Sequence, residues 1–271
     1  MTTRRTLLPL ALAGLLACGT VAAARHGAAA PSDATLETPV AGLPEILLHR
    51  GTCNAWVLRD GEAAIVVDPG DAGVLDALAR EGVRPEWILL TDHHREGCQG
   101  MARVDRGVTK VAAPIGERDF LERPLDFRKW RPSLGDAHAV HGASYLRPPA
   151  EPIPLDRLLA DGETFTWRSW ELRCVATPGT SPGGMSYVAH RGGKTIALTG
   201  GVMHDGAKMT NWFDTEWDYG FGKGLDALVA SASSLRDLAP DLALPSRGPV
   251  IDDAAAQFGR YHEKLLAFRP D

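Results

Sequence analysis

The chain has 271 residues, 44% of them hydrophobic and 23% charged, which is typical of a soluble globular protein with one large core or two small ones. Its net charge of -5 and its pI near 6.0 exclude the basic surface that nucleic-acid-binding domains carry, so no nucleic-acid partner is expected. Beyond the N-terminal segment, no apolar run is long enough to span a bilayer.

Residues 1–24 have the pattern of an export signal. Arg4 and Arg5 precede an apolar run at residues 7–16, and small residues follow at 21–24. The start fits either a twin-arginine signal or an ordinary secretory signal. Leu15-Leu16-Ala17-Cys18 resembles a lipobox, so a lipid anchor at Cys18 is the one membrane contact considered. We therefore expect a periplasmic or extracellular protein, with a membrane-anchored lipoprotein as the alternative. A flexible arm at residues 25–44 and one domain at residues 45–271 complete the expected organisation.

Apolar runs of strand length alternate with helical patterns in the first half of the domain. The predicted strands are residues 55–58, 64–67, 87–90 and 109–113. The predicted helices are residues 74–81, with Asp71 as a candidate cap, 97–104 and 117–122. This alternation favours a sheet that is covered by helices.

A long excursion rich in Pro, Gly and His separates the two halves at residues 131–154. It contains His138 and His141, which either join a metal site or are solvated loop residues. The second half is rich in strands, predicted at residues 163–167, 170–176, 185–190, 194–198 and 242–244. Helices are predicted at residues 225–238 and 252–268.

The polar stretch Thr91-Asp92-His93-His94-Arg95-Glu96-Gly97-Cys98-Gln99-Gly100 follows a buried strand. The end of a central strand is a common place for a site in an α/β sheet. In extended backbone, alternate side chains share a face, which would place Asp92, His94 and Glu96 together. Two carboxylates and an imidazole at one point predict a chemically active site.

This stretch resembles the Thr-His-x-His-x-Asp-His-x-Gly-Gly motif of the metallo-β-lactamase superfamily. Later segments resemble further family motifs in the same order, namely residues 176–183, 198–201 and 244–249, and the stretches at 54–58 and 64–70 resemble its opening hairpin. The resemblance implies an α+β fold, a single-domain, four-layer αβ/βα sandwich with the site at the shared sheet edge.

The resemblance also implies a metal site, but most of its ligand types are replaced here. The corresponding positions hold Asp92, His94, Glu96, Gly97, Thr180, Gly201 and Arg247. Glycine has no side-chain donor, threonine is a poor one, and arginine carries a fixed positive charge. We therefore expect a degenerate site that holds zinc weakly or at one position at most. Any remaining metal would be held by Asp92, His94 and Glu96, with His204 as a possible replacement ligand.

Two kinds of function follow from these residues. One is a metal-dependent hydrolase of an ester, amide or phosphoester that uses a reduced single-metal site. The other is a non-catalytic or metal-independent relative that binds a small molecule, in which Asp92 or Glu96 could orient His94 as a general base. The candidate ligand contacts are Arg247, Thr180, His93, His204, Trp212 and Trp217.

The segment at residues 211–221 interleaves aromatic and acidic side chains and includes Trp212 and Trp217. In the fold that the resemblance implies, it begins near the site. It is either a loop that lines a ligand or a loop held by its own aromatic residues.

Two pairings complete the expectations. Cys53 and Cys98 lie toward the site end of the implied fold and form the candidate disulfide in an oxidising compartment, against the alternative of buried free thiols. Arg247 is expected to pair with Glu96 or Asp92 and to replace the charge of the second metal, unless its side chain turns to solvent.

Overall fold

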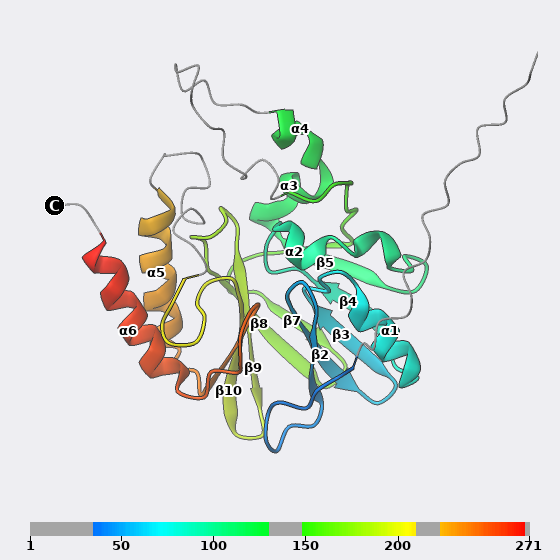
Figure 1. The fold of residues 1–271 in the computed structure, drawn as a ribbon, viewed down its shortest axis with the longest axis horizontal. Coiled ribbons are helices and arrows are strands. Elements are labelled where there is room, and N and C mark those ends of the chain that lie inside the picture. Colours follow the sequence, from blue (N-terminus) through cyan, green and yellow to red (C-terminus); the bar gives the residue numbers. More distant parts are fainter. Residues whose placement is uncertain (1–34, 130–147, 210–222, 269–271) are drawn as a thin grey trace, which may run out of the picture. The chain divides into compact units, whose positions relative to one another are not determined.

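Two sheets face each other in the structure, which is a computed structural model that describes residues 35–129, 148–209 and 223–268 (Figure 1). The first sheet contains, in spatial order, β1 (Ile46–Arg50), β2 (Asn54–Asp60), β3 (Ala63–Val67), β4 (Arg84–Leu89), β5 (Lys110–Pro114) and β6 (Arg157–Leu159). Antiparallel pairing joins β1 to β2 and β2 to β3, and parallel pairing joins β3 through β6.

The second sheet has the spatial order β11 (Leu242–Pro245), β10 (Lys194–Gly200), β9 (Met185–Arg191), β8 (Trp170–Ala176) and β7 (Thr164–Trp167). Its strands pair antiparallel except for β10 and β11, which are parallel. Each sheet therefore has a parallel pair of strands whose carboxyl ends lie at one edge, β3 with β4 and β10 with β11.

Helices cover the outer face of each sheet (Figure 1). On the first sheet lie α1 (Gly73–Arg80), α2 (Arg95–Cys98) and α3 (Arg118–Glu122), with short 3-10 turns at Met101–Arg103 and Ile115–Glu117, and α4 (Pro124–Lys129) continues beyond α3. On the second lie α5 (Lys223–Asp237) and α6 (Ala254–Ala267). The arrangement is the predicted four-layer αβ/βα sandwich. No helix in the described ranges is both long and apolar enough to cross a membrane.

Alternation along the strands of the first sheet divides its side chains between two cores. Ile46 and Leu48 join the core between the sheets, whereas Leu47 joins the core under the helices. The same period of two sends Trp56 into the inner core and Val57 to the helix side. Because both faces of the sheet are covered, its strands read as nearly continuous apolar runs, as the sequence of β3 does.

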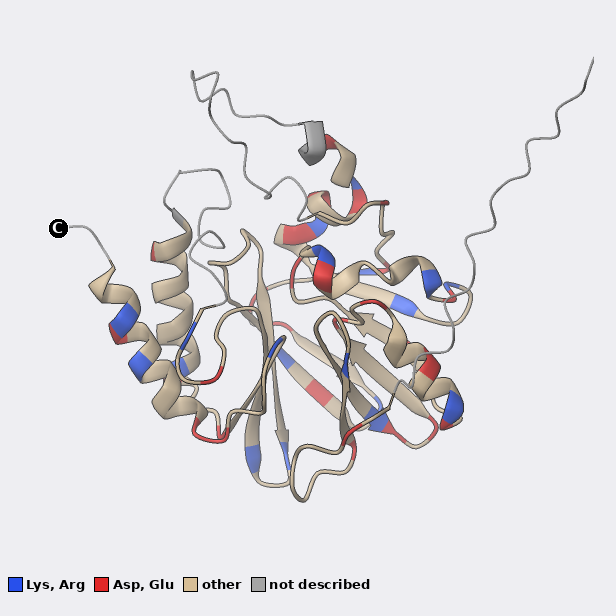
Figure 2. Ribbon diagram, in the orientation of Figure 1, with Lys and Arg blue, Asp and Glu red and all other residues tan. Residues whose placement is uncertain are grey.

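Charged residues of both signs are interspersed along the described elements (Figure 2). Many form ion pairs at the surface, such as Arg103 with Asp76, at 2.7 Å, and Arg168 with Glu86, at 2.6 Å. Such exposed pairs contribute little stability individually.

Three boundaries differ from the sequence expectations. Residues 35–44, predicted as part of a flexible arm, contact the domain, because Val40 and Leu43 are buried in the inner core and Glu37 forms a β-bridge with Leu48. The short β6 lies just after the predicted excursion. A helix that was not predicted, α4, begins at Pro124, because the first turn of a helix needs no N–H from proline.

Candidate functional site

A small cleft opens at the edge where the parallel strands of both sheets end. Its lining residues are Cys53, Asp68, Thr91, Asp92, His94, Glu96, Gly97, Thr180, Gly201, Ser246 and Arg247. The cavity volume is about 30 Å³, which is enough for a water molecule. All seven positions that the family resemblance singled out therefore line one cleft, while their chemical roles stay predictions.

Strand ends place these residues. Asp68 follows β3, and Thr91 and Asp92 follow β4, while Gly201 follows β10 and Arg247 follows β11. The two halves are joined at the edge by main-chain bonds, since Met185 N donates to Thr91 O at 2.9 Å and Asn54 N donates to Ser246 O at 2.7 Å. The site is thus a product of both sheets.

The sequence argument assumed extended backbone from Asp92 to Glu96, but in the structure the extended segment ends at His94. Asp92 Oδ1 accepts a hydrogen bond from His94 N at 2.8 Å, and α2 begins at the next residue, Arg95. An aspartate that accepts from the backbone two residues ahead forms a local turn. The three side chains of Asp92, His94 and Glu96 still reach the same cleft, by way of this turn and the first turn of α2.

Asp92 and His94 form a largely buried pair. Asp92 Oδ2 lies 3.2 Å from His94 Nδ1, and each side chain is 11% exposed. Burial alone would raise the pKa of Asp92, but the charge and hydrogen bonds of His94 outweigh it and lower that pKa to about 2. Asp92 is therefore an ionised carboxylate that fixes the orientation of the imidazole ring.

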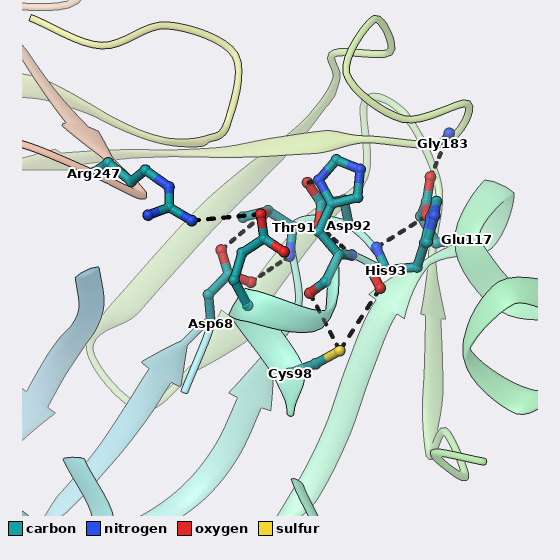
Figure 3. Close-up of polar contacts among 10 residues, drawn as sticks. Asp68, Thr91, Asp92, His93, Cys98, Glu117, Gly183 and Arg247 are labelled. Atoms are coloured by element: carbon teal, nitrogen blue, oxygen red, sulfur yellow. Dashed lines mark hydrogen bonds and ion pairs between the residues drawn. The ribbon is translucent and has the colours of Figure 1, made fainter. Parts of the chain in front are cut away.

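Asp68 is a site residue that sequence reasoning did not single out. Its carboxylate accepts hydrogen bonds from Thr91 N at 2.8 Å and from Thr91 Oγ1 at 2.7 Å (Figure 3). Burial, together with the negative charge of Asp92, raises the pKa of Asp68 to about 7. Its φ of 52° is also uncommon for a residue other than glycine. The available signal was its place at the end of the opening hairpin motif.

Arg247 and Glu96 meet at the rim of the cleft. Arg247 Nη2 lies 3.5 Å from Glu96 Oε1, and the two side chains are 45% and 46% exposed. The predicted pairing with Glu96 is confirmed in its geometry. The pair is not buried, because both groups are half in solvent.

His93 does not line the cleft, contrary to its predicted role as a ligand contact. Its ring stacks on Phe120, with centroids 4.3 Å apart, and its Nδ1 bonds to the fully buried Glu117. Glu117 also accepts from His93 N at 3.1 Å and from Gly183 N at 2.5 Å (Figure 3). Glu117 therefore ties the loop after β4 to the loop after β8, which carries Thr180.

The predicted Cys53–Cys98 disulfide is wrong for this structure, in which Cys53, Cys98 and Cys174 are buried free thiols. Cys53 Sγ donates to Asp68 O at 3.5 Å, and Cys98 Sγ donates to His94 O at 3.4 Å. Burial raises the pKa of both the Cys53 and the Cys98 thiol well above the ordinary value. Each of these two thiols therefore donates a hydrogen bond to a nearby backbone carbonyl instead of bonding to the other sulfur.

His204 lies outside the cleft lining, although it was predicted as a replacement ligand. Its Nδ1 lies 3.3 Å from Arg247 O, to which it donates. Trp212 and Trp217, the predicted aromatic contacts, lie outside the described residues, as do His138 and His141.

The donor set of the cleft does not fit the two metal ions that the family resemblance implies. Within the described ranges, no three His, Cys, Asp or Glu side chains are placed to hold one metal ion together. Asp92 is engaged with His94, and Glu96 faces the guanidinium of Arg247. A fixed positive charge at the rim opposes a divalent cation electrostatically.

Comparison with known proteins places this site in a wider context. A hydroxyacylglutathione hydrolase of Acidiphilium cryptum is 30% identical over 135 residues, which are 49% of this chain and 43% of that protein. A hydroxyacylglutathione hydrolase of Stenotrophomonas maltophilia is 46% identical over 67 residues, 23% of this chain and 26% of that protein. The matches thus span less than half the length of these relatives.

Among solved structures, the B3 metallo-β-lactamase BLEG-1 superposes with a TM-score of 0.60 at 24% identity, covering 84% of this chain and 97% of that one. A metallo-β-lactamase of Cronobacter sakazakii gives the same TM-score at 20% identity, covering 86% and 93%. At these identities the likeness concerns the fold. The model of the metallo-β-lactamase superfamily matches residues 49–246, and this chain therefore belongs to that superfamily.

Proposed function

We propose that this chain is a hydrolase-like protein whose cleft works without the usual two-metal site, with His94 as general base and Asp92 as the residue that orients it. The observation that carries the proposal is the buried Asp92–His94 pair beside a space the size of a water molecule. A carboxylate that holds an imidazole in one orientation and stabilises its protonated form is the arrangement that general-base catalysis requires.

The substrate class we propose is an acyl thioester of a small anionic thiol. Support comes from the matched relatives, which are named as hydroxyacylglutathione hydrolases. In the proposed reaction, His94 takes a proton from water, the resulting hydroxide attacks the acyl carbon, and the thiol leaves as a thiolate. A thiolate is a good leaving group, because an ordinary thiol has a pKa of about 8.5. Arg247, half exposed at the rim, is placed to attract a substrate carboxylate.

The test is hydrolysis of an S-(2-hydroxyacyl)glutathione by metal-analysed protein before and after treatment with a chelator. We expect activity to survive chelation and to fall about 100-fold or more in the His94→Gln variant, the usual contribution of a general base. Asp92→Asn should lower the rate and shift its pH profile. His190→Gln is the matched control, because that histidine bonds to Thr195 on an exposed part of the second sheet.

The second candidate is the reduced single-metal hydrolase. Asp92, His94 and Glu96 line the same cleft, although no three such side chains of the described residues are placed to hold one ion together. Bound zinc, iron or manganese in stoichiometric amount, with activity that is lost on chelation and restored by the metal, would establish it instead. If acyl thioesters and esters are bound but never turned over, the cleft belongs to a binding protein.

We also propose export of the chain to the periplasm or beyond, on the basis of residues 1–24. Replacing Arg4 and Arg5 together by Lys separates the two routes, because a twin-arginine signal requires the arginines whereas a general secretory signal needs only positive charge. Cell fractionation gives the readout. A chain that stays in the cytoplasm with its native N-terminus would refute export, and lipid labelling tests the anchor at Cys18.

A further inference from the structure

A second pocket lies on the opposite side of α2 from the cleft. Glu96 and Gly97 of this helix face the cleft, whereas Arg95, Cys98 and Gln99 line the second pocket. Successive helical residues are about 100° apart, so these two sets occupy opposite faces of one turn. The volume of the second pocket is about 260 Å³.

The floor of this pocket is apolar and is formed by residues of the buried core. Met101, Val104 and Ile153 line it, and their side chains are only 6%, 7% and 5% exposed. All three belong to the core cluster between the first sheet and its helices. An engineered apolar cavity of about 150 Å³ binds benzene, so this pocket can take a ring or a short chain. It is smaller than the sites of drug-sized ligands, which start at about 300 Å³.

The charged groups at the wall include one guanidinium that is not committed to a carboxylate of the described residues. Two arginines, Arg95 and Arg106, and one glutamate, Glu151, line the pocket. Arg106 is committed to Asp156, at 2.7 Å, and to the carbonyl of Pro154. Arg95 is half-buried, and its side chain has no hydrogen-bond or ion-pair partner among the described residues. Its guanidinium is therefore available to a ligand carboxylate, which it can bind through two parallel hydrogen bonds.

We propose that this pocket binds a small apolar carboxylate, with its ring or short chain on Met101, Val104 and Ile153 and its carboxylate on Arg95. This inference goes beyond the proposed function and does not depend on it. The pocket shares α2 with the cleft, and Cys98 Sγ, at the common wall, bonds to the carbonyls of His93 and His94.

The experiment is a titration of the full chain with phenylacetate, followed by the methyl resonances of protein labelled with methyl-¹³C methionine. We expect the Met101 resonance to shift in a saturable way, while those of Met203 and Met209, in the core between α5 and α6, stay fixed. The neutral phenylacetamide should bind about tenfold or more weakly, because it cannot form the charge-assisted bonds.

Variants test separately the carboxylate contact at Arg95 and the apolar part of the pocket. Arg95→Gln should weaken phenylacetate about tenfold and leave phenylacetamide unchanged. Ala102→Phe should block both probes, since Ala102 lines the pocket and its side chain would fill it. Arg103→Gln is the control, because Arg103 pairs with Asp76 and is not part of the lining. Absence of a Met101 shift at millimolar phenylacetate, equal affinity in Arg95→Gln, or tighter binding of phenethylamine would each overturn the proposal.

Discussion

The guanidinium of Arg247 lies 3.5 Å from the carboxylate of Glu96, and the two groups meet half in solvent at the rim of the cleft. In the sequence resemblance, Arg247 and Glu96 align with metal-ligand positions of the family. In this structure the two side chains form an ion pair with each other. Water screens this pair, so its strength differs from that of a buried ion pair.

Arg247→Ala should therefore cost little stability. We expect a loss of about 1 kcal/mol or less in the free energy of unfolding, the range for exposed ion pairs. The measurement is chemical denaturation of wild type and variant, with Glu96→Gln as the partner change. A loss of about 3 kcal/mol or more would mean that the pair is desolvated in solution.

The double change Gly201→Asp with Arg247→His should increase zinc affinity if the cleft keeps its ancestral geometry. A Cβ added at Gly201 would lie 3.6 Å from Thr180 Oγ1, an ordinary contact, so an aspartate can be accommodated there. The replacement also removes the charge that opposes a cation. Calorimetric titration with zinc measures the gain. Equal affinities of wild type and double variant would argue that the cleft no longer has the geometry of a metal site.

Asp68 should make stability depend on pH between about 4 and 7. Its pKa is about 7 in the fold and 3.8 in the reference state, so in this window the folded chain binds more protons than the unfolded one. The contribution of Asp68 to stability is then fully present below pH 4 and falls as pH rises, by on the order of 2–4 kcal/mol. Asp92 acts in a different window, because its lowered pKa gives stability that is present above pH 3.8 and is lost as pH falls toward 2.

The Asp68→Asn variant isolates the first effect. Asparagine cannot ionise but can still accept from Thr91 N, so the decline between pH 4 and 7 should flatten. Denaturation midpoints at several pH values give the curve, and Glu62→Gln on an exposed turn serves as the control. Parallel curves for Asp68→Asn and wild type would show that Asp68 ionises normally.

Glu117→Gln should destabilise the chain although it changes one atom. Both carboxylate oxygens of Glu117 accept N–H bonds, so the new amide group must face a donor. A buried group without its partner costs about 1–3 kcal/mol. Hydrogen exchange should also accelerate in residues 177–184. Glu122→Gln, which alters a surface pair with Arg118, should stay within about 0.5 kcal/mol of wild type.

Removing residues 1–24 should leave a domain that unfolds cooperatively and contains three titratable thiols. Cys53, Cys98 and Cys174 are free and buried, so they should react with a thiol reagent only after denaturation. Mass spectrometry under non-reducing conditions provides the check. A mass lower by two hydrogens in oxidised protein would restore the case for a disulfide.

Much of the fold could be predicted from local sequence, because apolar runs and the turn residues that bound them indicate where strands begin and end. The strand expected at residues 170–176 is β8 itself, and the apolar run at 64–67 is nearly all of β3. The three-residue β6 is too short to carry a pattern. The start of α2 was missed because a hydrogen bond from His94 to the side chain of Asp92, and not the apolar period, ends the extended segment.

The site, too, could be predicted only in part. Family motifs located the lining residues, since ordered motifs carry information about tertiary position. The motifs could not show that Asp68 reaches Thr91 across 23 residues of chain, or that His93 turns toward Glu117. Cys53 and Cys98 were paired from their expected proximity to the site, but each thiol faces a backbone carbonyl.

The last strand of the second sheet is fastened to the first hairpin, where Asn54 Nδ2 donates to Pro245 O at 3.0 Å and Trp56 Nε1 donates to the same oxygen at 3.0 Å. A ribosome delivers Asp92 and His94 long before it delivers Arg247. During synthesis, the cleft therefore lacks the part of its lining that Ser246 and Arg247 form until β11 emerges and docks. A small molecule that contacts Arg247 can be recognised only after this strand has docked, and its binding would report on that step of assembly.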